Sequence, residues 1–332
     1  MIISRTPFRI SFLGGGTDLP SFYNEEEGAV ISTTIDKYMY ITINDRFDES
    51  YRLSYSQTEI CENIGEIQHP IFKRVLELYG KEAFEKSIGR GLEMISMADI
   101  PSGTGLGSSS SFTVGLLHAM KAHLGLYPKA EDLAAEASKI EIEDLGEPIG
   151  KQDQYAAAYG GMRFIRFLPT GEVSVDPVVF RARQKRELES SIMMFYTGMR
   201  RSASEVLSDQ KAKTSKGQNR EALRAMRDLA YDLRKTLEED KPISRFGELL
   251  HEGWEIKKTV AKGVSLPQID DWYSRARDAG AWGGKILGAG GGGFLLLLAP
   301  ADKRDKIKKE LSELRPIDVG MDSWGSKVIF VG

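Results

Sequence analysis

The sequence has little cysteine, no histidine in a metal-binding pattern and no long apolar run. The single cysteine, Cys61, excludes an internal disulfide framework and fits a reducing compartment. The four histidines show no metal-ligand spacing. The longest strongly apolar run, residues 294–299, is far too short to cross a bilayer, and no secretory signal is visible at the N-terminus. We therefore expect a cytoplasmic protein without a histidine or cysteine metal centre.

The chain also lacks a strong net charge. Lys and Arg number 45 against 48 Asp and Glu, which gives a formal net charge of −3. This balance indicates neither a nucleic acid nor a membrane surface as a partner. The 332 residues, 41% of them hydrophobic, suffice for one or two domains with a real core. The partners that remain are small molecules, and a homodimer stays an open alternative.

Apolar periodicity predicts strands and helices mixed along the whole chain. This mixture is typical of the α+β class, in two packed domains. We place the first domain at 1–185 and the second at 186–332, because the segment 180–189 is highly charged. Strands are expected at 2–12, 30–35, 38–44, 51–55, 91–98, 162–167, 173–178, 192–197, 294–299 and 327–331. Helices are expected at 70–79, 111–124, 130–145, 152–158, 202–210, 219–238, 244–260, 266–279 and 302–314.

A loop rich in glycine and serine precedes the helix expected at 111–124. Glycines let the backbone approach a ligand closely, and a helix N-terminus leaves N–H groups unpaired and carries partial positive charge. Together these features predict a cradle for phosphate, with serine hydroxyls as further donors or Mg²⁺ ligands. The alternative is a loop that only caps the helix. The residues expected to bind the phosphates are Pro101, Gly103, Gly105, Leu106, Gly107, Ser108, Ser109 and Ser110.

The order Pro-x-Gly-x-Gly-Leu-Gly-Ser-Ser-Ser is neither a Walker loop nor a dinucleotide fingerprint. It resembles the phosphate loop of the GHMP kinases, which include galactokinase, homoserine kinase and mevalonate kinase. Two further glycine stretches, 14–16 and 288–293, match that family's other signature segments in position and order. The resemblance implies a ribosomal-protein-type β-α-β domain, a ferredoxin-like domain, and ATP with Mg²⁺ in the cleft between them. It also places Gly290 and Gly291 at the substrate.

The first stretch carries the acceptor side of the resemblance. Arg9 stands where sugar kinases of the family have an arginine, and Asp18 stands where they have an aspartate. The resemblance implies that Arg9 neutralises developing charge and that Asp18 holds sugar hydroxyls, beside Gly15, Gly16 and Thr17. Two glycines replace the Glu-His of galactokinases, which speaks against that substrate. The alternatives are an Asx turn at Asp18 and a surface ion pair at Arg9.

The segment 141–154 resembles the galactokinase segment that runs from a metal-binding glutamate to a catalytic aspartate. The resemblance implies that Glu141 and Ser109 are Mg²⁺ ligands and that Asp153 is the catalytic carboxylate. Glu143 is the rival ligand, because it lies two residues away on the same expected helix. The alternatives are a solvated helix face for the glutamates and a helix-terminal charge for Asp153.

Residues 4–23 look most like those of the D-glycero-D-manno-heptose 7-phosphate kinases. This resemblance implies ATP-dependent phosphorylation of an anomeric hydroxyl, for surface polysaccharide synthesis. An acceptor that already carries a phosphate needs a cation, and Arg200, Arg201 and Lys151 are the candidates. The alternative for the two arginines is solvated loop charges. Rival functions are a kinase for fucose, galactose or another sugar, and a catalytically silent sugar and ATP sensor.

Overall fold

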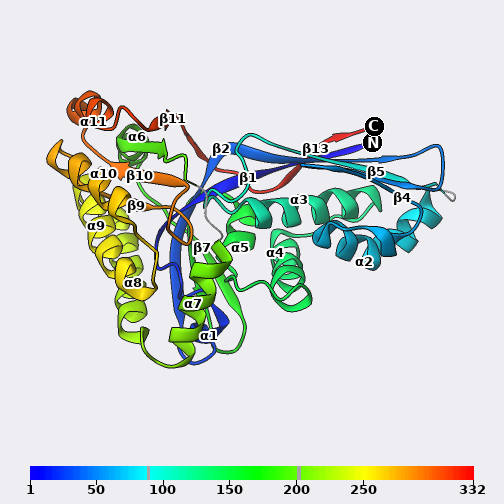
Figure 1. Cartoon of the computed structure of the whole chain (residues 1–332), viewed down its shortest axis with the longest axis horizontal. Coiled ribbons are helices and arrows are strands. Elements are labelled where there is room, and N and C mark those ends of the chain that lie inside the picture. Colours follow the sequence, from blue (N-terminus) through cyan, green and yellow to red (C-terminus); the bar gives the residue numbers. More distant parts are fainter. Residues whose placement is uncertain (88–89, 200–202) are drawn as a thin grey trace.

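The computed structural model describes residues 1–87, 90–199 and 203–332. It contains two β-sheets with helices packed against them, so the predicted α+β class is confirmed (Figure 1). None of the helices in these ranges is both long and apolar enough to cross a bilayer.

The larger sheet has the strand order β13-β1-β2-β5-β3-β4, and β2 also pairs with β6 and β12. Two of its strands, β1 and β2, are long and extend toward the second half of the molecule (Figure 1). From residue 6 onward β1 is buried on both faces. The strands are β1 (Ile2–Leu13), β2 (Gly28–Asp45), β3 (Tyr51–Ser54), β4 (Thr58–Cys61), β5 (Leu92–Ala98), β6 (Arg163–Phe167), β7 (Val173–Pro177), β12 (Met321–Asp322) and β13 (Lys327–Val331).

Helices cover one face of this sheet. Helix α3 lies along β1 and β2, and its residues 110–117 are all buried (Figure 1). Around it lie α2 (Pro70–Lys86), α4 (Ala130–Ser138), a π-helix (Lys139–Asp144) and α5 (Gln152–Tyr159), while α3 itself spans Ser108–His123. The buried residues of α3 therefore fix the helix whose N-terminus lies in the predicted phosphate loop, residues 101–110.

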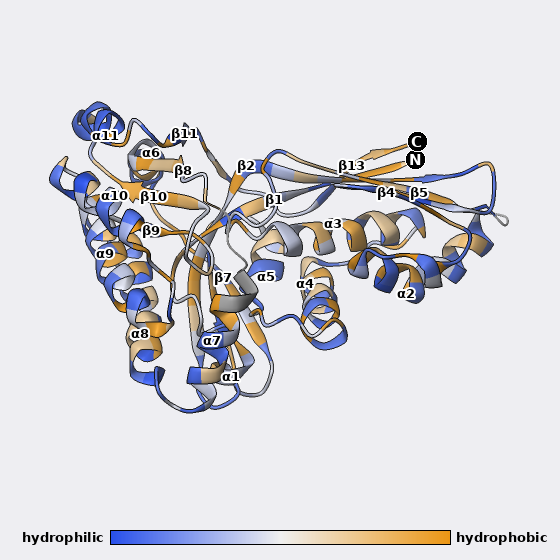
Figure 2. Ribbon diagram, viewed as in Figure 1, coloured by the Kyte–Doolittle hydropathy of each residue, from blue (hydrophilic) through white to orange (hydrophobic). Residues whose placement is uncertain are grey.

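The second sheet has the order β11-β8-β10-β9, with every pair antiparallel. Its β10 is the fully buried run FLLLL, and Figure 2 shows the strands of this sheet as hydrophobic and α11 as hydrophilic. The elements here are β8 (Ile192–Tyr196), β9 (Gly283–Ile286), β10 (Phe294–Leu298), β11 (Arg315–Ile317), α6 (Ala182–Ser191), α7 (Ala203–Ser215), α8 (Arg220–Glu238), α9 (Ile243–Val260), α10 (Pro267–Asp278) and α11 (Arg304–Glu310). Short helical elements are α1 (Pro20–Tyr23), Ile64–Glu66 and Ala301–Lys303.

The two sheets are joined at more than one place. Helix α8 packs on β1 and β2, and the last two strands, β12 and β13, return to the larger sheet. The boundary near residue 185 remains a prediction, and α6 occupies the charged segment where we placed it.

Several predicted elements are wrong in their bounds. The strands expected at 30–35 and 38–44 are one strand, β2, which bulges opposite β1 between Thr34 and Tyr38. The helix expected to stop at Gly80 runs on to Lys86, because Gly80 lies on the buried face, where a side chain would strike Ile64. The helix expected at 130–145 becomes a π-helix from Lys139. Strands β4, β9, β11 and β12 and helix α6 were not predicted.

Candidate active site

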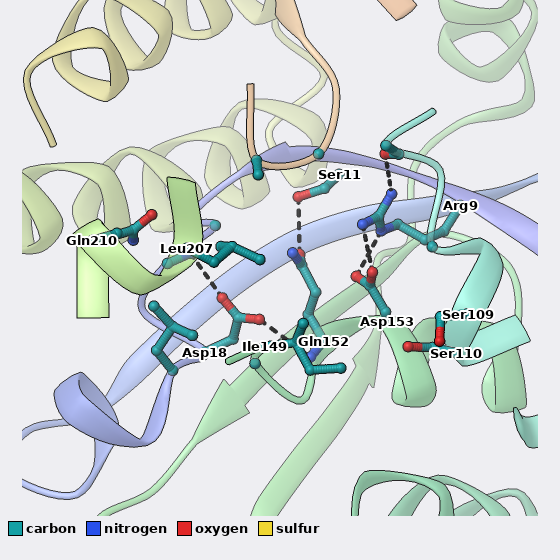
Figure 3. Close-up of a pocket in the computed structure, with 18 of the residues that line it drawn as sticks. Arg9, Ser11, Asp18, Ser109, Ser110, Ile149, Gln152, Asp153, Leu207 and Gln210 are labelled. Carbon is teal, nitrogen blue, oxygen red and sulfur yellow. Dashed lines mark hydrogen bonds and ion pairs between the residues drawn. The ribbon is translucent and has the colours of Figure 1, made fainter. Parts of the chain in front are cut away.

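A cavity of about 230 Å³ lies where six segments far apart in the sequence meet. They are β1 with the loop after it, the predicted phosphate loop with the start of α3, the start of α5, helix α7, helix α9, and β9 with the glycine loop after it. Figure 3 shows that side chains from these segments point toward one another. Its predicted lining residues are Arg9, Gly15, Gly16, Asp18, Gly103, Gly105, Gly107, Ser108, Ser109, Ser110 and Asp153.

The phosphate loop has the left-handed backbone that only glycine adopts readily. Gly103, Gly105 and Gly107 have φ of 74°, 83° and 75°, and α3 begins directly after Gly107. Unpaired N–H groups at the start of α3 therefore lie beside the cavity. Pro101 and Leu106 do not line it: Pro101 is exposed, and the carbonyl of the buried Leu106 accepts a hydrogen bond from Arg9 N at 3.1 Å.

Arg9 and Asp153 form a two-point ion pair at the centre of the cavity (Figure 3). Arg9 Nε donates to Asp153 Oδ1 at 2.7 Å, and a terminal guanidinium nitrogen donates to Oδ2 at 2.6 Å. The other terminal nitrogen donates to the Gly105 carbonyl at 2.6 Å. Arg9 follows the bulge in the β1–β2 pairing, and bulges redirect side chains in this way. The pair thus joins β1, α5 and the phosphate loop.

Glu141 is buried behind the serines of α3. Ser109 Oγ donates to Glu141 Oε1 at 2.6 Å, and Gln154 Nε2 donates to Oε2 at 2.6 Å. Burial raises the pKa of Glu141 to about 7 against these hydrogen bonds. Glu143, the rival ligand, is exposed, because the π-helix turns Ile140 and Glu141 inward.

These residues fit a Mg²⁺ ion. In the part of the chain that the structure describes, Glu141 has no ion pair, and a buried carboxylate favours a cation as its countercharge. The serine hydroxyl that touches it also lines the cavity. No cluster of three or more His, Cys, Asp or Glu suited to a metal occurs among the described residues. Two protein oxygens are enough for Mg²⁺, which takes most of its ligands from phosphate and water.

Asp18 lies at the opposite end of the cavity from the serines (Figure 3). Gly16 N donates to its Oδ1 at 2.7 Å, and Gln152 N donates to Oδ2 at 3.4 Å. Burial raises its pKa, and these backbone hydrogen bonds only partly oppose that shift. A Cβ at Gly150 would stand 2.0 Å from the Asp18 carboxylate, so Gly150 must lack a side chain.

Other predicted substrate residues lie away from the cavity. Thr17 is fully buried and donates to the Gly14 carbonyl at 2.8 Å. The Lys151 amine lies 5.0 Å from the centre of the Tyr23 ring, and burial lowers its pKa. Gly291 N donates to the Val264 carbonyl at 2.9 Å; Gly290 lies beside the same residue. Arg200 and Arg201 lie outside the described residues.

Half of the residues that line the cavity were not predicted from the sequence. Lys257 could have been found as a lysine on the apolar stripe of α9, after Leu250 and Trp254 at helical spacing. Gln210 carried no such signal; its Nε2 is buried without a hydrogen-bond partner among the described residues. The missed lining residues are Ser11, Leu19, Ile149, Gly150, Gln152, Leu207, Gln210, Lys257, Lys285, Gly288 and Ala289.

Comparison with known proteins now bears on this site. The GHMP kinases N terminal domain matches residues 70–161, and the GHMP kinases C terminal domain matches residues 216–316. A D-glycero-alpha-D-manno-heptose 7-phosphate kinase of Campylobacter jejuni is 32% identical over 317 residues, 93% of each chain. The chain belongs to the GHMP kinase family. It is therefore a small-molecule kinase that transfers a phosphoryl group to a hydroxyl.

Two further proteins are similar to this GHMP kinase over nearly its whole length. A galactokinase of Pyrococcus furiosus is 28% identical, over 92% of this chain and 91% of the relative. The solved structure of a D-glycero-D-manno-heptose 1-phosphate kinase from Bacteriodes thetaiotaomicron covers 100% of both chains with a TM-score of 0.79, at 24% identity. That likeness confirms the GHMP kinase fold implied by the three glycine stretches.

Proposed function

We propose that this kinase uses ATP to phosphorylate the anomeric hydroxyl of D-glycero-D-manno-heptose 7-phosphate, giving the 1,7-bisphosphate for nucleotide-activated heptose synthesis. The observation that carries the proposal is the 32% identity, over 93% of both chains, to a relative named for that acceptor. The Glu-His of galactokinases is replaced here by Gly15 and Gly16, which favours this acceptor over galactose.

In this reaction the acceptor hydroxyl gives its proton to the Asp153 carboxylate as its oxygen bonds to the γ-phosphorus of ATP. The bond from that phosphorus to the bridging oxygen breaks, and ADP leaves. Both Asp153 oxygens already accept from Arg9, yet each keeps a lone pair that can receive the hydroxyl hydrogen. Arg9 holds the carboxylate in place and supplies positive charge, and phosphoryl transfer depends chiefly on such positioning and charge.

The serine end of the cavity would hold the phosphates. N–H groups at the start of α3 are free to bind phosphate oxygens, as at other helix N-termini. Ser109 and Glu141 would hold Mg²⁺, which supplies positive charge to the phosphate oxygens when bound.

At the other end, Asp18 would accept hydrogen bonds from acceptor hydroxyls. The Nε2 of Gln210, which has no hydrogen-bond partner among the described residues, lies beside Gly16 and would donate to the same acceptor. A carboxylate and an amide donor together suit a polyhydroxyl compound.

The sharpest test of the acceptor is an ADP-release assay with heptose 7-phosphate, unphosphorylated heptose, fucose, galactose and mevalonate. We expect the highest kcat/KM for heptose 7-phosphate, and ³¹P NMR of the product should show a phosphate on the anomeric oxygen. Preference for fucose or galactose would replace the proposed acceptor. If none of these compounds supports ATP turnover, the catalytically silent sensor is favoured.

A cation must also bind the phosphate that the acceptor already carries, and Arg200 and Arg201 remain our prediction for it. Losing a charge-assisted hydrogen bond costs about 1.5–3 kcal/mol. Arg200→Ala or Arg201→Ala should therefore raise the KM for heptose 7-phosphate by roughly 10- to 150-fold, with little change in the KM for ATP. If both variants keep the preference for the phosphorylated sugar, the cation is Lys151 or another residue.

A further inference from the structure

Two lysines of the C-terminal half line the cavity and have no role in the reaction as described so far. They are Lys257 on α9 and Lys285 on β9, and both are buried, with exposed fractions of 8% and 4%. A lysine is rarely buried this deeply without a carboxylate. Yet the structure shows no ion pair for either residue within the described ranges.

Lys285 has a structural explanation. Its ammonium nitrogen donates to the carbonyls of Ser11 and Phe12 at 2.9 and 2.8 Å, and so joins β9 to the end of β1. Burial, with Lys257 and Arg9 nearby, lowers its pKa well below the usual value. Burial disfavours the charged form of this lysine, and its amine already donates to two carbonyls, so it is poorly suited to bind an anion.

Lys257 is placed differently. The described residues give its ammonium one hydrogen-bond acceptor, the Gly288 carbonyl. Gly288 abuts the phosphate loop so closely that a Cβ on it would stand 2.5 Å from Gly105 Cα. Gly105 is also the residue whose carbonyl accepts from Arg9. The ammonium of Lys257 and the guanidinium of Arg9 are thus fixed to two adjoining loops at one point of the cavity.

Arg9 and Lys257 differ in how far their positive charge is already neutralised by a carboxylate. Asp153 pairs with two nitrogens of Arg9, so the guanidinium is largely neutralised. Among the residues that the structure describes, Lys257 has no such partner, and two of its three N–H groups remain for another acceptor. Phosphoryl transfer moves negative charge through this place, between the phosphate loop and Asp153.

We propose that Lys257 is a catalytic residue, whose ammonium donates to the non-bridging oxygens of the phosphoryl group during its transfer. The proposal rests on the proposed phosphoryl transfer from ATP and not on which acceptor receives it. It adds a cation from the C-terminal half to Arg9 from the N-terminal half, so the reacting group is held from both sides of the cavity.

The protonation of Lys257 gives a readout that a structural role would not. Burial, and then the charge of Arg9, lower its pKa to about 8, while Asp18 opposes the shift. The charged groups facing it are Arg9 on β1, Asp18 after β1, and Lys285 on β9. Because the protonated form is the active one, kcat/KM should fall as the pH rises through about 8.

The first experiment needs no acceptor. Calorimetry compares the binding of ATP and ADP, each with Mg²⁺, to the parent, Lys257→Met and Lys258→Met. Methionine keeps the buried stem without the charge, and Lys258 is the matched control because it pairs with Glu255 outside the cavity. We expect the parent to bind ATP more tightly than ADP, the Lys257 variant to lose about tenfold or more of that difference with ADP binding unchanged, and the control to keep it.

The second experiment uses whichever acceptor the parent phosphorylates. Lys257→Met should lower kcat about 10²–10³-fold, the cost of losing one donor to developing charge. Lys257→Arg should regain part of that loss and lack the alkaline fall, because guanidinium does not titrate there. A Lys257→Met protein that keeps both its ATP–ADP difference and its kcat within about threefold overturns the proposal. A variant changed only in its preference for phosphorylated acceptors also overturns it, and would make Lys257 the acceptor-phosphate cation.

A parent that phosphorylates none of the sugars leaves this proposal intact, because calorimetry still decides it. Circular dichroism and thermal unfolding of each variant confirm that it folds. If Lys257→Met is unstable, Lys257→Arg carries the test: loss of the alkaline fall with retained ATP–ADP discrimination supports the proposal, and an unchanged pH profile overturns it.

Discussion

The carboxylates of the cavity fall into two kinds. Asp153 is ion-paired through both oxygens, whereas Glu141 and Asp18 are buried and, among the described residues, accept hydrogen bonds from neutral donors. The paired carboxylate is set in one orientation before any ligand arrives. The other two have no ion pair among the described residues, and burial raises the pKa of both. We therefore propose that Asp153 takes part in the reaction and that Glu141 and Asp18 bind ligands.

The strongest test of this contrast removes the charge of the paired carboxylate. Asp153→Asn should lower kcat by about 10²–10⁴-fold, because the variant can no longer take the hydroxyl proton. ATP binding, measured by calorimetry, should stay close to that of the parent. Turnover above about a tenth of the parent's would exclude a base of this size.

The next test concerns Glu141 as a ligand. Glu141→Gln and Ser109→Ala should raise the Mg²⁺ concentration that gives half-maximal activity, by roughly 10- to 100-fold, and excess Mg²⁺ should partly restore the rate. Glu143→Gln is the matched control, since Glu143 is exposed and only two residues away. If the Mg²⁺ requirement is the same in all three variants as in the parent, neither predicted ligand holds the ion.

The smallest effect is expected for Asp18 in the ligand-free protein. Because burial raises its pKa above the ordinary 3.8, the folded state binds its proton more tightly than the unfolded state does. The parent therefore loses stability as the pH rises above about 3.8, the ordinary pKa of an aspartate, and the Asp18→Asn variant does not lose it. The melting temperature of the variant, relative to the parent, should therefore rise as the pH increases above about 3.8. If the difference in melting temperature between variant and parent does not change with pH, burial does not raise the pKa of Asp18.

Much of the reacting centre could be predicted from the sequence. Arg9, Ser109, Glu141 and Asp153 were chosen because each stands in a short segment whose order of residues matches a family pattern, and the structure brings all four together. Their catalytic, metal and phosphate roles remain predictions. The choice between Glu141 and Glu143 needed the structure, because a π-helix breaks the ordinary helical spacing on which a face is predicted.

The C-terminal wall could not be predicted in the same way. Gln210 belongs to a helix in which a single polar residue gives no local signal of the cavity it will face. Lys257 is marked only by its place on the apolar stripe of α9, which does not say what it faces. The glycines 290 and 291 were predicted at the substrate from their run, yet Gly288 and Ala289 are the ones that line the cavity. A run of glycines predicts a tight loop, and packing decides which of its members meets the ligand.

The return of β13 to the larger sheet bears on the order of folding. Ile2 pairs with Val331, so β1 is synthesised long before β13, its outer neighbour in the sheet. Until β13 has been made, the outer edge of β1 carries unpaired backbone N–H and C=O groups, which can pair with strands of other chains. Contacts this remote in sequence also slow folding, because a long loop must close first. During synthesis, α3 and β2 can cover the rest of β1, while its outer edge stays unpaired until synthesis reaches β13.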